Sequence, residues 1–94
     1  MKIEYDAAKN ARNVRERGLS FERAAEFDFE AAITMEDRRR EYGEIRYRSL
    51  GILDQRLHAL VFTFRGESLR VISLRKANRK EGRLYAERTG SGND

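Results

Sequence analysis

The sequence contains no cysteine, no proline and no tryptophan, and it holds a single histidine. The absence of cysteine excludes a disulfide framework and a metal site built on thiolates. No apolar run approaches the length of a membrane span, and no signal-peptide pattern opens the chain. We therefore expect a soluble protein of the cytoplasm that makes no contact with a membrane.

Hydrophobic and charged residues are about equally frequent, at 39% and 38% of the 94 residues. A chain of this length makes one domain with a single modest core and a heavily charged surface. We expect residues 1–88 to form this domain and residues 89–94 to be a disordered C-terminal tail.

The formal net charge of +4 is unevenly distributed along the chain. Residues 65–88 hold eight Lys and Arg against three Glu, whereas residues 26–37 hold five acidic residues and no basic one. Most of the basic residues are Arg, which suits bidentate phosphate recognition better than Lys does. The basic segment would attract a polyanion such as nucleic acid at long range. A solvated surface held together by ion pairs is the alternative interpretation.

The segment from Arg56 to Glu81 predicts a β-hairpin followed by a basic helix. Both alternating sets of side chains in residues 57–64 are mainly apolar, which is typical of an interior strand covered on both faces. A short loop around Gly66 leads to a second strand over residues 69–74. Alternation places Leu69 and Val71 on one face of that strand and Leu74 on the other.

Caps and periodicity predict the remaining elements. We expect an edge strand at residues 2–5, a helix from Ala7 to Gly18 capped by Asp6, a second helix capped by Ser20, strands at residues 31–35 and 44–53, and a last helix at residues 79–88. Asn78 and Glu81 have the spacing of a capping box for the last helix. The expected fold is therefore α+β, in the order β-α-α-β-β-β-β-α, with a mainly antiparallel sheet packed against helices.

Common catalytic and metal-binding patterns are missing from the sequence. His58 lies inside an apolar strand, where we expect a packing residue rather than a catalytic base. The carboxylates between residues 28 and 37 lack the spacing of a calcium loop, and there is no glycine-rich phosphate loop. We therefore expect neither a metal site nor a cofactor.

Arginines on three neighbouring predicted strands are the remaining candidates, namely Arg46, Arg48, Arg65, Arg70 and Arg75. If the register brings some of them to one face, they form a concave cationic site beside the last helix. Such a site could bind a phosphodiester and stabilise the charge of a pentacoordinate transition state. Proton transfer could then use Tyr85, Glu81 or Lys76. A surface ion pair, or phosphate binding without catalysis, is the alternative for each arginine.

Several motifs, in order along the chain, carry a resemblance to a known family. They are Tyr5-Asp6-Ala7-Ala8-Lys9 with Asn13, Arg17-Gly18-Leu19-Ser20-Phe21-Glu22, Arg46-Tyr47 with Leu50-Gly51, and Arg70 to Ala77 continued by Glu81 and Tyr85. Together they resemble the BrnT toxins of bacterial BrnT–BrnA toxin–antitoxin systems over about residues 3–88.

The resemblance implies a compact α/β toxin related to the RelE-like ribonucleases. It implies RNA cleavage that blocks translation, with the RNA 2′-hydroxyl as the nucleophile and without a metal. It also implies a BrnA-like antitoxin that neutralises the toxin, with operator DNA bound only through the toxin–antitoxin complex.

The residues expected to act in catalysis are Arg46, Arg65, Arg75, Tyr85 and Glu81. The residues expected to bind RNA are Arg48, Arg70, Lys76, Arg79 and Lys80. The sequence departs from the family pattern at the first turn, where members often carry Lys-His-Gly and this chain has Glu16-Arg17-Gly18. A role for that histidine in RNA contact would therefore require Arg17 to substitute as a cation.

Two other functions remain open at this point. A non-catalytic nucleic-acid-binding module would share the basic surface and would need exposed aromatic rings for base stacking, for which Tyr42 and Tyr47 are the candidates. A protein whose basic surface serves only to bind an acidic antitoxin would bind its partner and leave RNA intact.

Overall fold

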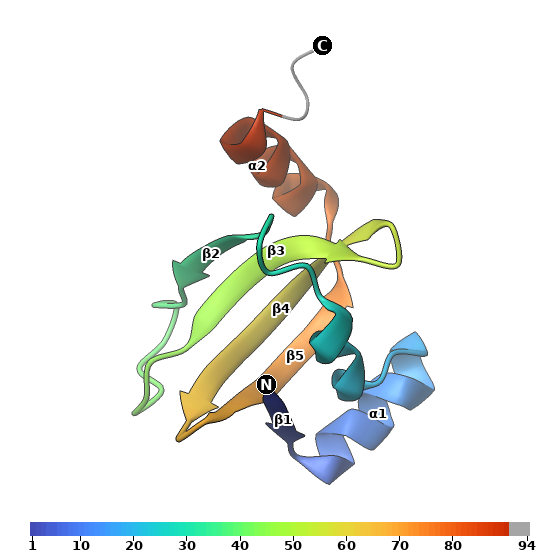
Figure 1. Ribbon diagram of the computed structural model, residues 1–94, viewed down its shortest axis with the longest axis vertical. Coiled ribbons are helices and arrows are strands. Elements are labelled where there is room, and N and C mark those ends of the chain that lie inside the picture. Colours follow the sequence, from blue (N-terminus) through green and yellow to red (C-terminus); the bar gives the residue numbers. More distant parts are fainter. Residues whose placement is uncertain (91–94) are drawn as a thin grey trace.

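A five-stranded sheet is the central element of the computed structural model, which describes residues 1–90 (Figure 1). The elements are β1 (Lys2–Tyr5), α1 (Ala7–Arg17), the 3-10 helix η1 (Phe21–Glu26), β2 (Ile33–Glu36), β3 (Tyr47–Leu53), β4 (Arg56–Arg65), β5 (Ser68–Lys76) and α2 (Arg79–Thr89). The strands lie in the order β1-β5-β4-β3-β2. The expected α+β class is confirmed.

The sheet is mixed. Each pair of neighbours from β2 to β5 is antiparallel, as expected, but β1 pairs in parallel with β5. The chain leaves β1, runs beside the β1–β5 side of the sheet as α1, crosses one face as η1 and the segment after it, and enters β2 at the opposite edge (Figure 1). This crossover leaves β1 as an edge strand beside β5, the last strand in the sequence.

A β-bulge in β5 overturns the predicted alternation. Val61 pairs with Ser73 and the next residue, Phe62, pairs with Val71, so Ile72 has no partner on β4. The extra residue shifts the side-chain alternation by one position. Leu74 therefore faces the same side as Leu69, and the prediction that the two leucines face opposite sides was wrong.

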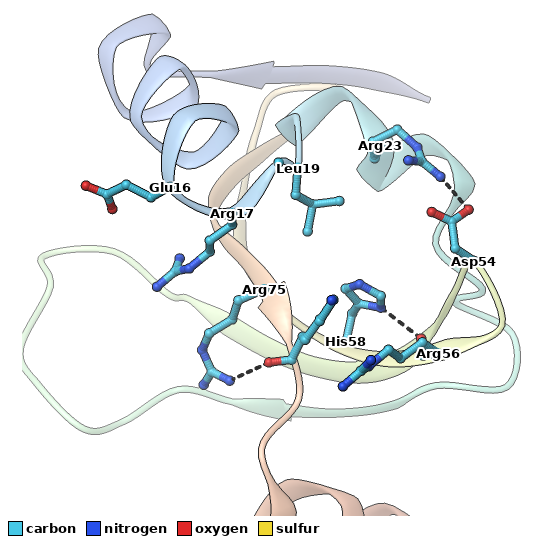
Figure 2. Close-up of a pocket in the computed structure, with 10 residues that line it drawn as sticks. Glu16, Arg17, Leu19, Arg23, Asp54, Arg56, His58 and Arg75 are labelled. Atoms are coloured by element: carbon cyan, nitrogen blue, oxygen red, sulfur yellow. Dashed lines mark hydrogen bonds and ion pairs between the residues drawn. The ribbon is translucent and has the colours of Figure 1, made fainter.

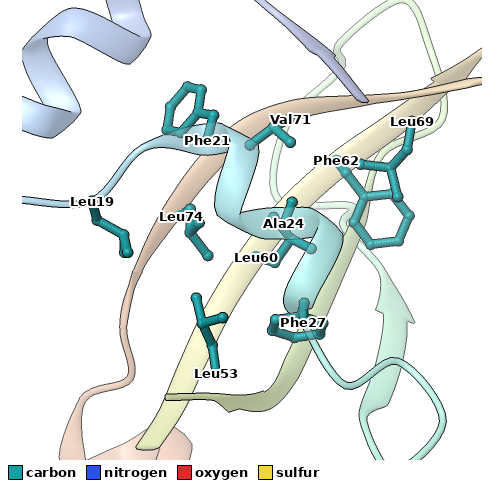
Figure 3. Close-up of a cluster of buried hydrophobic side chains, with 10 residues drawn as sticks. All are labelled: Leu19, Phe21, Ala24, Phe27, Leu53, Leu60, Phe62, Leu69, Val71 and Leu74. Atoms are coloured by element: carbon teal, nitrogen blue, oxygen red, sulfur yellow. The ribbon is translucent and has the colours of Figure 1, made fainter. Parts of the chain in front are cut away.

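The main core lies between the sheet and the segment that crosses it (Figure 3). Its buried members are Leu19, Phe21, Ala24, Phe27, Leu53, Leu60, Phe62, Leu69, Val71 and Leu74. Gly51 of β3 is required for this packing, because a Cβ there would lie 2.6 Å from a ring carbon of Phe27. The missing side chain thus allows the ring to lie directly on the strand.

The second predicted helix is a short 3-10 helix. Ser20 caps it as predicted, with its hydroxyl accepting a hydrogen bond from the Glu22 N–H, but the helix is a six-residue 3-10 segment. The chain becomes extended at Phe27, and the Asp28 N–H donates to the Ile52 carbonyl. Contacts with β3 therefore end the helix where local propensity alone would let it continue.

The last helix begins with the predicted capping box. The Asn78 side chain accepts from the Glu81 N–H, and the Glu81 carboxylate accepts from the Asn78 N–H. The helix includes Thr89, and Gly90 follows in the left-handed conformation, so neither residue belongs to a tail. Residues 91–94, the rest of the expected tail, lie outside the described residues.

The second face of the sheet is also partly covered, as the apolar pattern of β4 predicted. Ala59 and Thr63 are both buried, and the Thr63 hydroxyl donates to the Ile45 carbonyl in the loop before β3. That loop is longer than expected, because β3 begins at Tyr47 rather than at residue 44, and β2 spans Ile33–Glu36 rather than residues 31–35.

Within residues 1–90, no helix has the length and apolar character needed to cross a membrane.

Candidate active site

The predicted catalytic arginines do not come together. Arg46 lies in the loop before β3 and Arg65 at the end of β4, and both form ion pairs with Glu44, at 2.9 and 3.6 Å. Arg75 is opposite Ala59, six positions along β4 from Arg65. At about 3.3 Å per residue this separation is roughly 20 Å. The register therefore does not bring these three arginines to one site.

Other predicted cations are also neutralised within the fold. Arg70 pairs with Glu4 of β1 at 3.0 Å, on the face where these neighbouring strands are in register. The guanidinium carbon of Arg46 lies 4.3 Å from the centre of the Tyr42 ring. These contacts tie β5 to β1 and order the loop before β3, so they account for the two arginines without a ligand.

A cleft of about 640 Å³ lies where α1 ends, beside the β3–β4 turn and the end of β5 (Figure 2). We call it the His58 cleft. Its lining residues are Glu16, Arg17, Gly18, Leu19, Arg23, Asp54, Arg56, His58, Arg75 and Lys76. The lining thus contains five cationic side chains, two carboxylates and the only imidazole of the chain.

Three cations of the His58 cleft are not neutralised. Arg23 and Asp54 pair with each other at 2.6 Å on one wall. Among residues 1–90, no carboxylate forms an ion pair with Arg17, Arg56 or Lys76. An anion that entered this cleft would therefore meet cations that have no counter-ion in the fold.

Asn13 holds the α1 end of the cleft in place. Its buried amide donates to the carbonyls of Leu19 and Leu74, at 2.8 and 3.0 Å, and its oxygen accepts from Arg17 at 3.0 Å. One side chain thus joins α1, the link to η1, and β5. Our sequence reasoning missed this role, although Asn13 stood among the residues that carry the family resemblance.

His58 is buried, as expected of a packing residue, with only 4% of its surface exposed. Its Nδ1 lies 2.8 Å from the Arg56 carbonyl, which can only accept, so Nδ1 carries the hydrogen. In the neutral ring this leaves the lone pair on Nε2. The ring also lines the cleft, in the middle of the side chains drawn in Figure 2. The expectation of a simple packing role therefore missed the open side of the ring.

A second cleft, of about 560 Å³, lies between β3, β5 and α2. We call it the Arg48 cleft. It is lined by Arg39, Arg48, Arg75, Asn78, Lys80, Glu81, Arg83, Leu84 and Glu87. Arg75 belongs to both clefts, so the two form adjoining parts of one cationic surface.

Glu81 orients Arg75. The two carboxylate oxygens accept from the two terminal nitrogens of Arg75, at 2.8 and 2.9 Å, and one of them also accepts from the Asn78 N–H. The hydrogen bonds from Arg75 are the main reason why the pKa of Glu81 is lowered, and Glu81 in turn raises the pKa of Arg75. A carboxylate held in this way is a weak proton acceptor, which does not fit the proton-transfer role expected for Glu81.

Of the other predicted site residues, some line a cleft and others do not. Arg48 has a buried Nε with no hydrogen-bond partner among residues 1–90, and Lys80 lies beside it in the Arg48 cleft. Arg79 is exposed on α2. The Tyr85 hydroxyl donates to the Ala31 carbonyl at 3.3 Å, and the residue lines neither cleft. The structure thus places Arg48, Arg75, Lys80 and Glu81 in the Arg48 cleft and Lys76 in the His58 cleft, and it leaves Tyr85 outside both.

A comparison with known protein families identifies the family of the chain. A family model described as the ribonuclease toxin BrnT of type II toxin–antitoxin systems matches residues 5–81. The chain belongs to the BrnT family. The matched segment contains the whole lining of the His58 cleft, together with Arg48 and Glu81 of the second. No curated protein matches the chain.

One departure from the BrnT pattern falls in the His58 cleft. Arg17 occupies the position where, by the resemblance described above, BrnT members often carry histidine. The only imidazole of this chain, that of His58, faces the same cleft from β4. The cleft therefore contains an imidazole, although position 17 carries arginine instead of histidine.

Proposed function

We propose that this BrnT toxin cleaves RNA at the His58 cleft. The observation that supports the proposal best is the gathering of three unneutralised cations, Arg17, Arg56 and Lys76, around one open cleft. A phosphodiester that entered the cleft would serve as their counter-ion. The same groups would stabilise the additional charge of a pentacoordinate transition state.

Each basic residue near the clefts has a distinct role in this proposal. Arg75, held in place by Glu81, and Lys76 contact the reacting phosphate. Arg48 and Lys80 bind the neighbouring phosphates in the second cleft. Arg46 and Arg65, with Glu44 as their partner, take no part in the reaction.

The cellular function follows from this chemistry. The RNA 2′-hydroxyl is the nucleophile and the step requires no metal, as in the RelE-like ribonucleases to which we relate the fold. Cleavage occurs in the cytoplasm and blocks translation. A BrnA-like antitoxin neutralises the toxin, and the complex of the two binds operator DNA through the antitoxin.

Induced expression in a bacterial host tests the proposal. The wild type should stop growth and fragment total RNA, whereas Arg75→Ala should do neither, because removal of one charge-stabilising donor costs about 10²–10³-fold in rate. Arg65→Ala is the matched control and should remain toxic. Intact RNA in cells that contain folded wild-type protein would contradict the proposal, and so would full toxicity of a folded Arg75→Ala variant.

A non-catalytic single-strand-binding function is the second candidate. Phe64 is 55% exposed, and its ring centre lies 5.9 Å from that of Tyr47 at the end of the sheet that carries Arg65. Exposed rings beside a cation provide a surface on which bases stack. Tight binding of single-stranded RNA that depends on Phe64, without any cleavage, would favour this function over the first.

A further inference from the structure

The His58 cleft contains a buried titratable group to which the proposed function has so far given no role. His58 lies opposite Gly51 of β3, and one of its ring nitrogens is held by the Arg56 carbonyl. The hydrogen bond fixes both the tautomer and the orientation of the ring. No described group forms a hydrogen bond with Nε2, and this atom is not among the fully buried ones that lack a partner. Nε2 is therefore an acceptor without a partner, on a side chain that lines the cleft.

The acidic groups around the cleft are poor alternatives as proton acceptors. Glu16 lies exposed at the end of α1, and Asp54, whose side chain is 62% exposed, is paired with Arg23 of η1. Glu81, behind Arg75, has a lowered pKa and three hydrogen bonds to its carboxylate. None of the three combines burial in the cleft with an unoccupied acceptor atom.

The cationic groups around the ring suit a reaction at phosphorus. Arg17 reaches the cleft from α1, Arg56 from β4, and Arg75 and Lys76 from β5. A phosphate bound by Arg17, Arg56 or Lys76 lies beside the imidazole, because these side chains and His58 line the same cavity. The nucleophile adjacent to that phosphate in RNA is the 2′-hydroxyl, which must lose a proton to attack.

From this geometry we infer that His58 is the general base of the cleavage reaction, an inference that rests on the proposed function. Nε2 takes the proton of the 2′-hydroxyl while that oxygen bonds to phosphorus. The bond from phosphorus to the 5′-oxygen breaks, and its electron pair stays on that oxygen, which takes a proton from water. The hydroxide so formed removes the proton from the imidazolium. The products are a 2′,3′-cyclic phosphate and a 5′-hydroxyl end.

His58→Asn tests the inference, because asparagine can still donate to the Arg56 carbonyl but has no titratable nitrogen. On a single-stranded RNA, kcat/KM should fall by about 10²–10⁴-fold. Wild-type kcat/KM should rise with pH, because a general base acts only in its deprotonated form, and the variant should lose this rise. Its Kd for an uncleavable 2′-deoxy analogue should stay at the wild-type value. Arg65→Gln should behave as the wild type in each assay.

The single histidine allows a second test on the unaltered protein, made without a histidine tag. Diethyl pyrocarbonate should modify one imidazole and abolish cleavage, bound 2′-deoxy RNA should protect against it, and hydroxylamine should restore activity. This test holds even where the substituted protein does not fold.

The outcomes separate the two proposals. Wild-type protein that binds RNA without cleaving it overturns the proposed function. If the wild type cleaves RNA and His58→Asn keeps the wild-type rate and pH profile, only the role of His58 is overturned. The same follows if cleavage continues after His58 is modified, or if the reagent fails to modify His58 and cleavage is unaffected.

Discussion

The two ends of the β4–β5 hairpin both carry basic side chains, and they differ in what neutralises them. At the turn end, Arg65 shares Glu44 with Arg46, and Arg70 pairs with Glu4. At the other end Arg75 pairs with Glu81, but Arg56 and Lys76 have no carboxylate partner among residues 1–90. Judged only by the number of basic residues, the two ends would be equally good candidates for phosphate binding. Carboxylates from distant segments neutralise the arginines of the turn end, so the other end is the one that can bind a phosphate.

The largest effect on the cleft end is expected from Asn13→Ala. The change leaves two buried carbonyls, those of Leu19 and Leu74, without a donor and releases Arg17. We expect a loss of about 2–4 kcal/mol in the free energy of unfolding, together with slower RNA cleavage. Urea denaturation and a cleavage assay measure the two effects.

Asn10→Ala is the matched control for this prediction. The Asn10 oxygen accepts from the Phe21 N–H at 2.7 Å, and the hydrogen bond of Arg17 goes to Asn13 rather than to Asn10. This variant should lose stability but retain its cleavage rate per folded molecule. Equal loss of cleavage in the two variants would show that Asn13 does not act through Arg17.

Glu81→Gln should weaken the connection between the cleft end and α2. Because the folded-state pKa of Glu81 is lowered, its contribution to stability is present above the ordinary pKa of about 4.3 and is lost as the pH falls through the folded value. At neutral pH we expect a cost of about 1.5–3 kcal/mol. The difference in free energy of unfolding between wild type and variant should shrink on acidification.

Thermal or urea unfolding between pH 3 and 7 measures this difference. Glu87→Gln is the control, because it removes another carboxylate from the Arg48 cleft, and it should leave the pH dependence unchanged. A wild-type minus Glu81→Gln difference that stays constant from pH 7 to 3 would argue against the ion pair with Arg75.

A smaller effect is expected where Glu44→Gln makes the turn end resemble the cleft end. The change leaves Arg46 and Arg65 without a carboxylate partner. We expect several-fold tighter RNA binding at low salt and a steeper salt dependence, by about 1–2 in the slope of log K against log salt. The cleavage rate of bound RNA should stay the same. Glu67→Gln in the β4–β5 turn gives the same change in charge, and an equal gain in affinity there would mean that only net charge matters.

Sequence patterns predicted the features that depend on neighbours in the chain. The hairpin, the capping box of Asn78 and Glu81, and the position of β1 at an edge were all recognised in this way. Each depends on residues a few positions apart, where alternation and capping preferences act.

The features that sequence patterns missed depend on contacts between distant segments. The bulge at Ile72 and the early end of η1 are decided by packing against β4 and β3. Glu44 neutralises Arg65, which lies 21 positions away in the sequence, and no local pattern indicates such a pair. For the same reason the open side of His58 became visible only when α1 and β5 were placed around it.

The most direct test of the account removes two charges from one end of the hairpin or two from the other. Purified Arg17→Ala/Lys76→Ala and Arg46→Ala/Arg65→Ala variants would be compared with the wild type for cleavage of a labelled single-stranded RNA. Unfolding curves would confirm that each protein is folded. We predict that the first variant loses cleavage by about 10²-fold or more, while the second stays close to the wild-type rate. Equal losses in the two variants, or loss in the second alone, would contradict the assignment of the reaction to the His58 cleft.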